Sequence, residues 1–259
     1  MLHLTIDSGV ARLTFDNPSR LNAINEAMWR SFPEILAQVQ DDVTVRALVF
    51  QGAGDRAFCS GNDISEFEKV RADQLAAAAY NALQRDVASR FRALTKPSIA
   101  AIHGYCLGAG FELALMCDLR VCTHDAQFGV PAVKLGLPYR LEDIATLLSV
   151  VGLAQAREMV LLGRRYGGEG ALRLGLVNWL AGSAAEMATI VDAALADLTS
   201  AAPLSLAAAR VAFQELARRD GPPDLERAQQ AADRCYASRD YAEGRAAQRE
   251  KRKPAFQGN

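Results

Sequence analysis

The part of the sequence that most constrains the fold runs from Lys96 to Asp118. Residues 98–102 form a short apolar run with the length and branching of a buried strand, and residues 111–117 are good helix formers. The segment between them, 104–110, contains three glycines. A strand, a glycine-rich turn and a helix in this order direct several backbone N–H groups toward one point, at the positive end of the helix dipole. Glu112 falls in the first helical turn, where it either complements the dipole or takes part in chemistry.

Strands and helices alternate through the first half of the chain, which predicts an α/β fold built from βαβ units. A second glycine-rich turn, 57–64, comes after an apolar strand that ends at Gly52. Because both turns follow strands, we expect them to open on the same side, where α/β sheets bind ligands. The expected strands are residues 2–5, 10–15, 47–52, 98–102 and 119–122, and the expected helices are residues 22–40, with Asn22 as the cap, and 72–94.

The second half of the sequence, from about Leu141, is almost entirely helical and ends in a basic tail, 249–254. We expect this half to cover the sheet or to form contacts between subunits. No segment rich in Gly, Ser or Pro separates two independent domains, so the 259 residues are expected to form one large domain, with or without an appendage. The expected helices are residues 142–151, 154–162, 169–174, 184–200, 204–219 and 225–237.

The composition narrows the classes of partner. The 29 basic and 30 acidic residues leave no basic excess for nucleic acid. The N-terminus lacks the apolar block of a signal peptide, and no run approaches the roughly 18 apolar residues that a membrane span needs. Five cysteines without a CxxC pair, and only three histidines, indicate buried thiols in a reducing compartment and argue against a metal site. We therefore expect a cytoplasmic protein with no membrane partner.

Five segments together carry a resemblance to a known family. They cover essentially the whole chain, in order and with family-like spacings. On them the chain resembles the crotonase, or enoyl-CoA hydratase/isomerase, superfamily. The segments are FCSGND (58–63), HGYCLGAGFELALMCD (103–118), AQFGVPAVKLGLP (126–138), EGALRLGLVN (169–178) and SRDYAEGRAAQREKRKPAFQGN (238–259).

The resemblance implies a particular architecture, a crotonase-type spiral of ββα units with a C-terminal helical region that mediates trimerisation. It divides the chain into a spiral core with the acyl-CoA site, residues 1–195, and a helical region for oligomerisation and CoA capping, residues 196–259. It also implies a homo-oligomer, either a trimer or a dimer of trimers. The substrate is expected to be an acyl-CoA thioester, and no separate cofactor is expected because the substrate carries the coenzyme A.

The family pattern also assigns roles to individual residues. By match to that pattern, the backbone N–H groups of Asn62 and Ala109 polarise the thioester carbonyl, and Glu112 faces the substrate. Such donors must lie within about 3 Å of the oxyanion that forms. Neighbouring glycines let the main chain approach the ligand closely. The residues expected to contact the coenzyme A portion are Arg20, Asn22, Ala23, Ser60, Gly61, Asp63, Ile64, Gly108, Lys253 and Phe256.

The sequence departs from the hydratase pattern at one position. Hydratases of this family usually present two glutamates to the substrate, and the first matches Glu112. The second should follow the proline of the QFG-x-P segment, where this chain has Ala132. An alanine side chain cannot move a proton, so the usual two-glutamate hydration is in doubt.

The segment Gly136-Leu137-Pro138-Tyr139 resembles the methylmalonyl-CoA decarboxylase branch instead, although that branch has a histidine in place of Asn62. Tyr139 would orient a departing carboxylate there, or it is only a packed loop aromatic. The next residues, Arg140, Glu142 and Asp143, either bring charge to the acyl pocket or form a solvated helix start.

Three functions remain open from the sequence. The leading prediction is an acyl-CoA lyase that forms an oxyanion-stabilised enolate, leaning to decarboxylation of a small 2-carboxyacyl-CoA. The first alternative is a one-glutamate enoyl-CoA hydratase, and the second is a non-catalytic acyl-CoA-binding protein.

Overall fold

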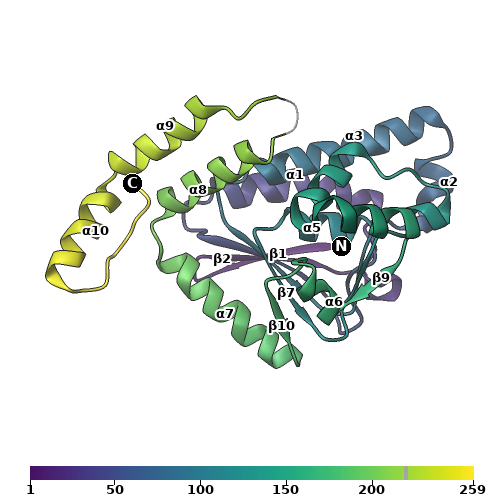
Figure 1. Cartoon of the computed structure of the whole chain (residues 1–259), viewed down its shortest axis with the longest axis horizontal. Helices are drawn as coiled ribbons and strands as arrows, with labels where there is room; N and C mark the ends of the chain where they lie inside the picture. Colours follow the sequence, from purple (N-terminus) through teal and green to yellow (C-terminus); the bar gives the residue numbers. More distant parts are fainter. Residues whose placement is uncertain (219–220) are drawn as a thin grey trace.

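A computed structural model describes residues 1–218 and 221–259 and contains two β-sheets (Figure 1). The larger sheet has the strand order β1-β2-β3-β5-β7-β10, and its strands run parallel except for the β1–β2 hairpin. The smaller sheet has the order β4-β6-β8-β9, with β4, β6 and β8 parallel. The strands of the larger sheet are Leu2–Asp7, Val10–Phe15, Ala47–Gly52, Ser98–Ile102, Leu119–Thr123 and Trp179–Ala181, and those of the smaller sheet are Ala57–Cys59, Tyr105–Leu107, Gln127–Gly129 and Arg165–Gly167.

Successive ββα units build these sheets. Each unit places its first strand in the larger sheet, its second strand in the smaller sheet, and then a helix or helices. The pairs β3–β4, β5–β6 and β7–β8 follow this rule, and both sheets keep the chain order of the units. The chain therefore winds as a spiral, which confirms the expected architecture. The helices that close these units are α2 (Phe67–Val70) with α3 (Gln74–Ala93), α4 (Ala109–Met116), and the short helix η3 (Pro131–Leu135) with α5 (Leu141–Leu162).

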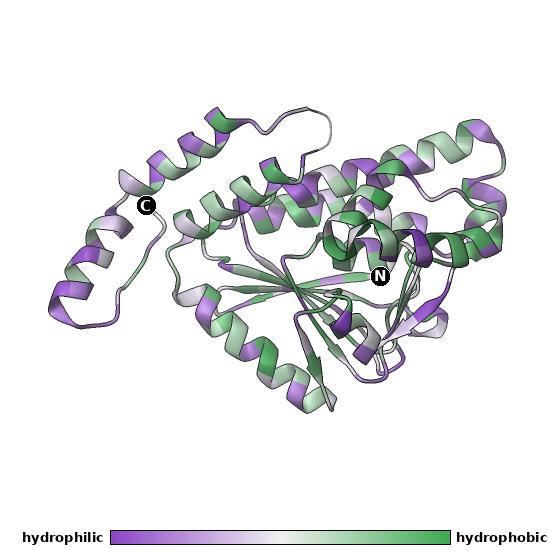
Figure 2. Ribbon diagram, in the orientation of Figure 1, coloured by the Kyte–Doolittle hydropathy of each residue, from purple (hydrophilic) through white to green (hydrophobic). Residues whose placement is uncertain are grey.

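The larger sheet is covered on both faces, and its strands show why. In β3, Leu48 and Phe50 join the core beneath α1 (Glu26–Asp41) and α3, while Ala47 and Val49 pack against α7 (Ala184–Ser200) on the opposite face. A strand sends alternate side chains to opposite faces, so a continuous apolar run is needed where both faces are covered. Figure 2 shows the resulting concentration of hydrophobic residues in the central strands.

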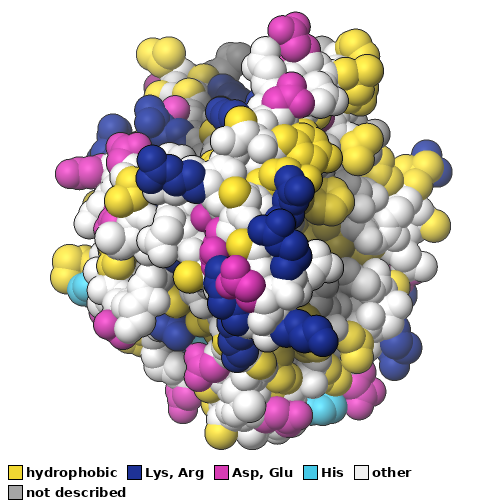
Figure 3. All heavy atoms as spheres, turned by 90° about the vertical axis from the view of Figure 1, so that its left-hand side faces the viewer, with side chains coloured by type: hydrophobic (Ala, Val, Ile, Leu, Met, Phe, Trp, Pro, Cys, Tyr) yellow, Lys and Arg dark blue, Asp and Glu magenta, His cyan; other side chains and the backbone are white. Residues whose placement is uncertain are grey.

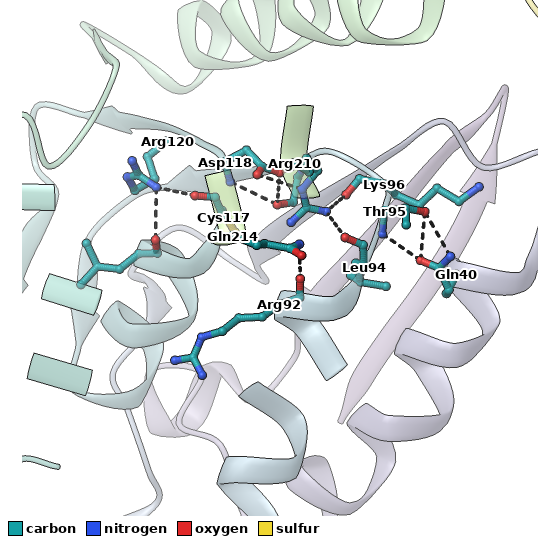
Figure 4. Close-up of polar contacts among 12 residues, drawn as sticks. Gln40, Arg92, Leu94, Thr95, Lys96, Cys117, Asp118, Arg120, Arg210 and Gln214 are labelled. Carbon is teal, nitrogen blue, oxygen red and sulfur yellow. Dashed lines mark hydrogen bonds and ion pairs between the residues drawn. The ribbon is translucent and has the colours of Figure 1, made fainter. Parts of the chain in front are cut away.

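One arginine connects the helix α8 (Pro203–Leu216) to the part of the chain that contains the larger sheet. Arg210 of α8 is buried; its Nε lies 3.0 Å from Oδ1 of Asp118, and its Nη1 donates to the backbone oxygens of Leu94 and Lys96 (Figure 4). These contacts satisfy a guanidinium that would otherwise be costly to bury. Beyond α8, helices α9 (Leu225–Tyr236) and α10 (Arg239–Glu250) extend away from the sheets (Figure 1). Figure 3 shows this side of the molecule, where hydrophobic side chains lie among lysines and arginines.

Some expected elements differ from the structure. Residues 57–59 and 105–107, taken as parts of glycine-rich turns, are the strands β4 and β6. The second half also contains two short strands, β9 and β10, and residues 239–250 of the tail form a helix. Asn22 does not cap a helix: the cap of α1 is Asn25, whose side chain accepts a hydrogen bond from the Met28 N–H. The end of the expected helix 204–219 lies outside the described residues.

Two further expectations concern membrane-spanning segments and the cysteines. Within the described part of the chain, α5 is long and apolar enough to cross a membrane by length and composition, and α7 and α8, bent by 106°, pass the same test together. In the structure, α5 packs against α4 and the helix η3. All the cysteines are free, and four of them are buried: Cys59, Cys106, Cys117 and Cys122.

Candidate active site

A cavity of about 120 Å³ opens at the carboxyl ends of the strands β4, β6 and β8. Because these strands are parallel neighbours, the residues that follow them meet at one edge. Asn62 follows β4, Ala109 follows β6, and Ala132 follows β8; all three line the cavity. The sequence prediction that both glycine-rich turns open on the same side is therefore confirmed.

The two glycine-rich turns are in contact. Gly61 has φ +104° and Gly108 has φ +49°, values that favour glycine. A Cβ atom on Gly61 would lie 3.0 Å from the Leu107 carbonyl oxygen and 3.5 Å from the Ala109 nitrogen. Among the described residues, the backbone N–H groups of Asn62 and Ala109 have no hydrogen-bond acceptor. Two free donors thus lie at the closest approach of the two turns.

The residues expected to contact coenzyme A fall into two groups. In the first group, backbone hydrogen bonds join residues 20–24 to residues 60–63. The Ile24 N–H donates to the Gly61 carbonyl (2.8 Å), and the Asp63 N–H donates to the Ile24 carbonyl (2.9 Å). This pairing brings together the first group: Arg20, Asn22, Ala23, Ser60, Gly61, Asp63 and Ile64, with Gly108 against Gly61.

Within that group, Asn22 has a structural task. Its side-chain nitrogen donates to the carbonyls of Ala53 (2.9 Å) and Ala57 (2.6 Å), and its side-chain oxygen accepts from the Asn17 N–H (3.0 Å). Both N–H groups of the buried amide are used, and the backbone N–H of Asn22 donates to the Asn17 carbonyl (2.9 Å), so Asn22 has no free donor for a ligand. Asp63 caps the turn that follows it by accepting from the Ser65 N–H and hydroxyl.

The second group, Lys253 and Phe256, lies elsewhere. Both follow α10, and neither lines the cavity. The Phe256 carbonyl accepts from Arg46, and its ring lies against Gly244 of α10. Within one chain these two residues therefore do not join the first group.

Glu112 lies inside the cavity, in the first turn of α4, with its side chain only 17% exposed. Arg140, at the start of α5, reaches it with Nη2 at 3.4 Å from a carboxylate oxygen. The same guanidinium contacts Asp143 more closely, with Nε at 2.6 Å and Nη2 at 3.0 Å. Burial, followed by the charge of Asp143, raises the pKa of Glu112 to about 8, although Arg140 opposes the shift. Glu112 is therefore mostly protonated at neutral pH.

Tyr139 presents a donor beside Glu112. Its hydroxyl is buried and makes no hydrogen bond of normal geometry among the described residues, but it lies close enough to the Glu112 carboxyl to lower the pKa of that group. Burial and the neighbouring Glu112 carboxyl raise the pKa of Tyr139 well above its usual value, so the hydroxyl keeps its proton. Ala132 lines the same cavity in the position where the family pattern has its second glutamate. The cavity thus contains Glu112 and Asp143 as its only carboxyl groups among the described lining residues, and Asp143 is paired with Arg140.

The structure also adds residues that the sequence analysis did not single out. The Asn62 side-chain oxygen accepts hydrogen bonds from Trp29 (2.8 Å), Gln84 (3.1 Å) and Tyr80 (3.2 Å). Three donors around one oxygen fix the orientation of the amide, so its nitrogen lies on the other side, free of any acceptor among the described residues. Arg71 also lines the cavity. No sequence motif marks these residues, because only the fold brings them together.

Comparisons with known proteins agree with this fold. The family model described as enoyl-CoA hydratase/isomerase matches residues 5–259. A short-chain-enoyl-CoA hydratase of Clostridium acetobutylicum is 30% identical over 94% of this chain and 92% of its own length. A peroxisomal Δ(3,5)-Δ(2,4)-dienoyl-CoA isomerase of Arabidopsis thaliana is 31% identical over 96% and 93%.

Solved structures give the same result. The crystal structure of an enoyl-CoA hydratase/carnithine racemase from Magnetospirillum magneticum aligns with a TM-score of 0.92 and 33% identity, covering 100% of this chain and 96% of the other. The crystal structure of a protein described as a putative enoyl-CoA hydratase/isomerase family protein from Hyphomonas neptunium aligns with a TM-score of 0.92 and 30% identity, covering 98% of this chain and 97% of the other. With the family model spanning nearly the whole chain, these similarities show that the protein belongs to the enoyl-CoA hydratase/isomerase, or crotonase, superfamily of acyl-CoA enzymes.

Proposed function

We propose that this protein hydrates a 2-enoyl-CoA, with Glu112 as the single acid–base group and a thioester enolate as the intermediate. The observation that carries the proposal is the place of Glu112, a titratable carboxyl inside the cavity, on the helix that begins at Ala109. Relatives described as enoyl-CoA hydratases support water addition as the reaction. This proposal replaces decarboxylation, the reaction that the sequence analysis favoured, because no relative named here supports it.

The free N–H groups of Asn62 and Ala109 supply the oxyanion hole in this proposal. Their position at the contact of the two turns lets one oxygen atom accept from both. Negative charge develops on the thioester oxygen during the reaction, and preorganised donors stabilise it there; losing one such donor typically costs about 10²–10³-fold in rate. Gly61 and Gly108 permit the close approach.

Water addition then needs one group that both accepts and donates a proton. In its ionised form Glu112 accepts a proton from water as the water oxygen bonds to C3 of the enoyl group. The electrons of the double bond move toward the thioester oxygen, where the two N–H groups hold them. Glu112 returns the proton to C2, so that one molecule of water has been added and the carboxylate is regenerated. Ala132 leaves no second carboxyl on the opposite side.

Decarboxylation is the second candidate, and the buried hydroxyl of Tyr139, which keeps its proton, is the observation that favours it. A carboxylate on C2 would accept a hydrogen bond from that hydroxyl. Loss of CO₂ leaves its bonding electrons as the enolate, and protonated Glu112 then supplies a proton to C2. This reaction uses the protonated form of Glu112, whereas hydration uses the ionised form.

A panel of acyl-CoA thioesters followed by mass spectrometry separates these functions. With the purified protein, we expect crotonyl-CoA to gain the mass of one water molecule. Loss of the mass of CO₂ from methylmalonyl-CoA, with crotonyl-CoA unchanged, would instead support the decarboxylase. No change in any thioester, together with tight binding, would indicate a non-catalytic acyl-CoA-binding protein.

We also propose that the protein assembles into a homo-oligomer, a trimer or a dimer of trimers. In this proposal residues 196–259 form the contacts between subunits, and residues 1–195 form the core of each subunit. Large hydrophobic side chains remain exposed in this helical region, among them Phe213, Leu216, Leu225, Tyr236 and Tyr241. Assembly would also give Lys253 and Phe256 a route to the coenzyme A bound by a neighbouring copy. A cytoplasmic location and a reaction without metal or separate cofactor remain predictions.

A further inference from the structure

Arg71 follows the helix α2 and lines the cavity that contains Glu112. Its guanidinium carbon lies 5.1 Å from the ring centroids of both Phe67 and Tyr80, so two aromatic rings hold it in place. Its Nε atom is buried and has no hydrogen-bond partner among the described residues. Within that part of the chain, no carboxylate lies within ion-pair distance of its guanidinium.

A buried N–H group without an acceptor is costly, because it has lost water and gained no hydrogen bond in exchange. Burial lowers the pKa of Arg71, as this cost predicts, but the group stays charged. Arg140, the other arginine in the cavity, has Asp143 as a close partner. Arg71 is therefore the cation that the protein leaves free for an acceptor from outside.

The other polar groups of the cavity agree with such an acceptor. The charged groups that line the cavity are Arg71, Arg140, Glu112 and Asp143, and only Arg140 and Asp143 form a close pair, so no carboxylate among the described lining residues is bound to Arg71. The side-chain nitrogen of Asn62 and the Nη1 atom of Arg140 are further donors without an acceptor among the described residues. An anionic oxygen group in the cavity would satisfy these donors together with Arg71.

We propose that the acyl chain of the substrate carries a carboxylate that binds Arg71, so that the substrate is the monothioester of a dicarboxylic acid with coenzyme A. The proposal deepens the proposed function, since it rests on the cavity being the acyl site. A phosphate of coenzyme A is the other anion that could reach a cation here. The two sources differ in a measurable way, because every coenzyme A thioester carries the phosphates but only some carry the carboxylate.

Calorimetric binding of two saturated thioesters tests the proposal without any turnover. Glutaryl-CoA ends in a carboxylate, and pentanoyl-CoA has the same chain length and ends in a methyl group. We expect the wild-type protein to bind glutaryl-CoA more tightly. Arg71→Met keeps an unbranched side chain between the rings, and it should weaken glutaryl-CoA binding by about 10- to 100-fold while changing pentanoyl-CoA binding by less than about 3-fold.

Two further variants complete the design. Arg71→Lys keeps the charge but loses the planar fork, so glutaryl-CoA affinity should fall between those of the wild type and Arg71→Met. Arg165→Met is the matched control: the Arg165 guanidinium lies 5.3 Å from the Tyr105 ring centroid, but Arg165 is exposed and does not line the cavity. It should leave both affinities unchanged.

Several results would overturn the carboxylate site. They are equal affinity of the wild type for both thioesters, an unchanged glutaryl-CoA affinity in Arg71→Met, or an equal loss for both thioesters. The last result would assign Arg71 to a coenzyme A phosphate or to structure alone. Absence of hydration on every enoyl-CoA would contradict the proposed function and leave this binding comparison intact, because neither thioester has a double bond to hydrate.

Discussion

The Nη2 atom of Arg140 lies 3.4 Å from a carboxylate oxygen of Glu112, while the same guanidinium holds Asp143 at 2.6 and 3.0 Å. The closer partner neutralises most of the charge that Arg140 could offer to Glu112. Burial therefore decides the protonation state of Glu112, and its pKa rises to about 8. A carboxyl that titrates near neutral pH can both donate and accept protons, as a single acid–base group must.

The first prediction is the pH dependence of hydration. Because the ionised form of Glu112 accepts the proton from water, kcat/KM for crotonyl-CoA should rise with pH and level off above about 8. The profile of kcat/KM reports the pKa of the free enzyme, which is the state described by the structure. Stopped-flow loss of the enoyl absorbance between pH 6 and 10 would measure it. A hydration rate that falls as the pH rises through about 8 would contradict the proposed mechanism, because the protonated form of Glu112 would then be the active one.

The second prediction moves that profile with Asp143→Asn. The substitution removes a negative charge that raises the pKa of Glu112 and frees Arg140 to pair with Glu112. Both effects stabilise the ionised carboxylate, so the rise in kcat/KM should shift to lower pH. Asp192→Asn is the control, because Asp192 pairs with Arg12 at the surface and does not line the cavity. An unchanged midpoint in Asp143→Asn would mean that another group sets the profile.

The sequence was sufficient for the central unit of the fold and for the position of the two turns. The run at 98–102, the glycines after it and Glu112 form a local pattern, and each part has a physical reason to be there. The strands β4, β6 and β8 were not predicted, since three residues are too few to show any periodicity.

The polar residues in and around the cavity could not be predicted from the sequence either. Arg71 and the donors around the Asn62 oxygen come from segments that meet only through the sheet order, and their spacing in the sequence carries no signal. Arg140 and Asp143 were noticed only as charges near Tyr139. Their pairing follows from the start of α5, where positions three apart lie on one face.

The third prediction tests the oxyanion hole with Ala109→Pro. Ala109 is the first residue of α4, a position that tolerates proline, so the substitution removes the N–H with little effect on the helix. We expect kcat to fall by about 10²-fold or more, with the protein still folded. Ala184→Pro, at the first position of α7 and exposed, is the matched control and should keep full activity. Normal turnover by folded Ala109→Pro would show that the donor lies elsewhere.

The fourth prediction concerns assembly. A groove lined by Tyr236, Tyr241 and Phe256 lies between α8, α9 and α10, and Phe213 of α8 is also exposed. Light scattering at micromolar concentration should give three or six times the 27.9 kDa mass of one chain. Phe213→Glu should weaken the assembly, because it places a charge on an apolar contact surface. Val43→Glu changes an apolar residue outside the helical region that is even more exposed, and it should not weaken the assembly. A monomeric wild type would contradict the proposed assembly.

The last prediction distinguishes the two reactions through Tyr139→Phe. The substitution keeps the ring and removes only a buried hydroxyl that makes no hydrogen bond of normal geometry among the described residues, so the melting temperature should not fall. In the proposed hydratase the hydroxyl transfers no proton, and it acts on Glu112 only by lowering the pKa of that carboxyl against the larger effect of burial. Tyr139→Phe should therefore hydrate crotonyl-CoA within about 3-fold of the wild type, whereas Glu112→Gln should lose about 10²–10⁴-fold. Tyr166→Phe is the control, because the Tyr166 hydroxyl donates to Glu158 and does not line the cavity.

Decarboxylation predicts the opposite pattern from the same proteins. If the Tyr139 hydroxyl orients a departing carboxylate, Tyr139→Phe should slow CO₂ release from methylmalonyl-CoA by roughly 10- to 10³-fold while leaving its binding nearly intact. Assaying each variant on both thioesters therefore tests each reaction directly. Crotonyl-CoA hydration that survives Tyr139→Phe and vanishes in Glu112→Gln would support the hydratase. A wild-type protein that releases CO₂ from methylmalonyl-CoA but leaves crotonyl-CoA unchanged would support the decarboxylase in place of the hydratase. The hydroxyl of Tyr139 would then act on the carboxylate that leaves as CO₂.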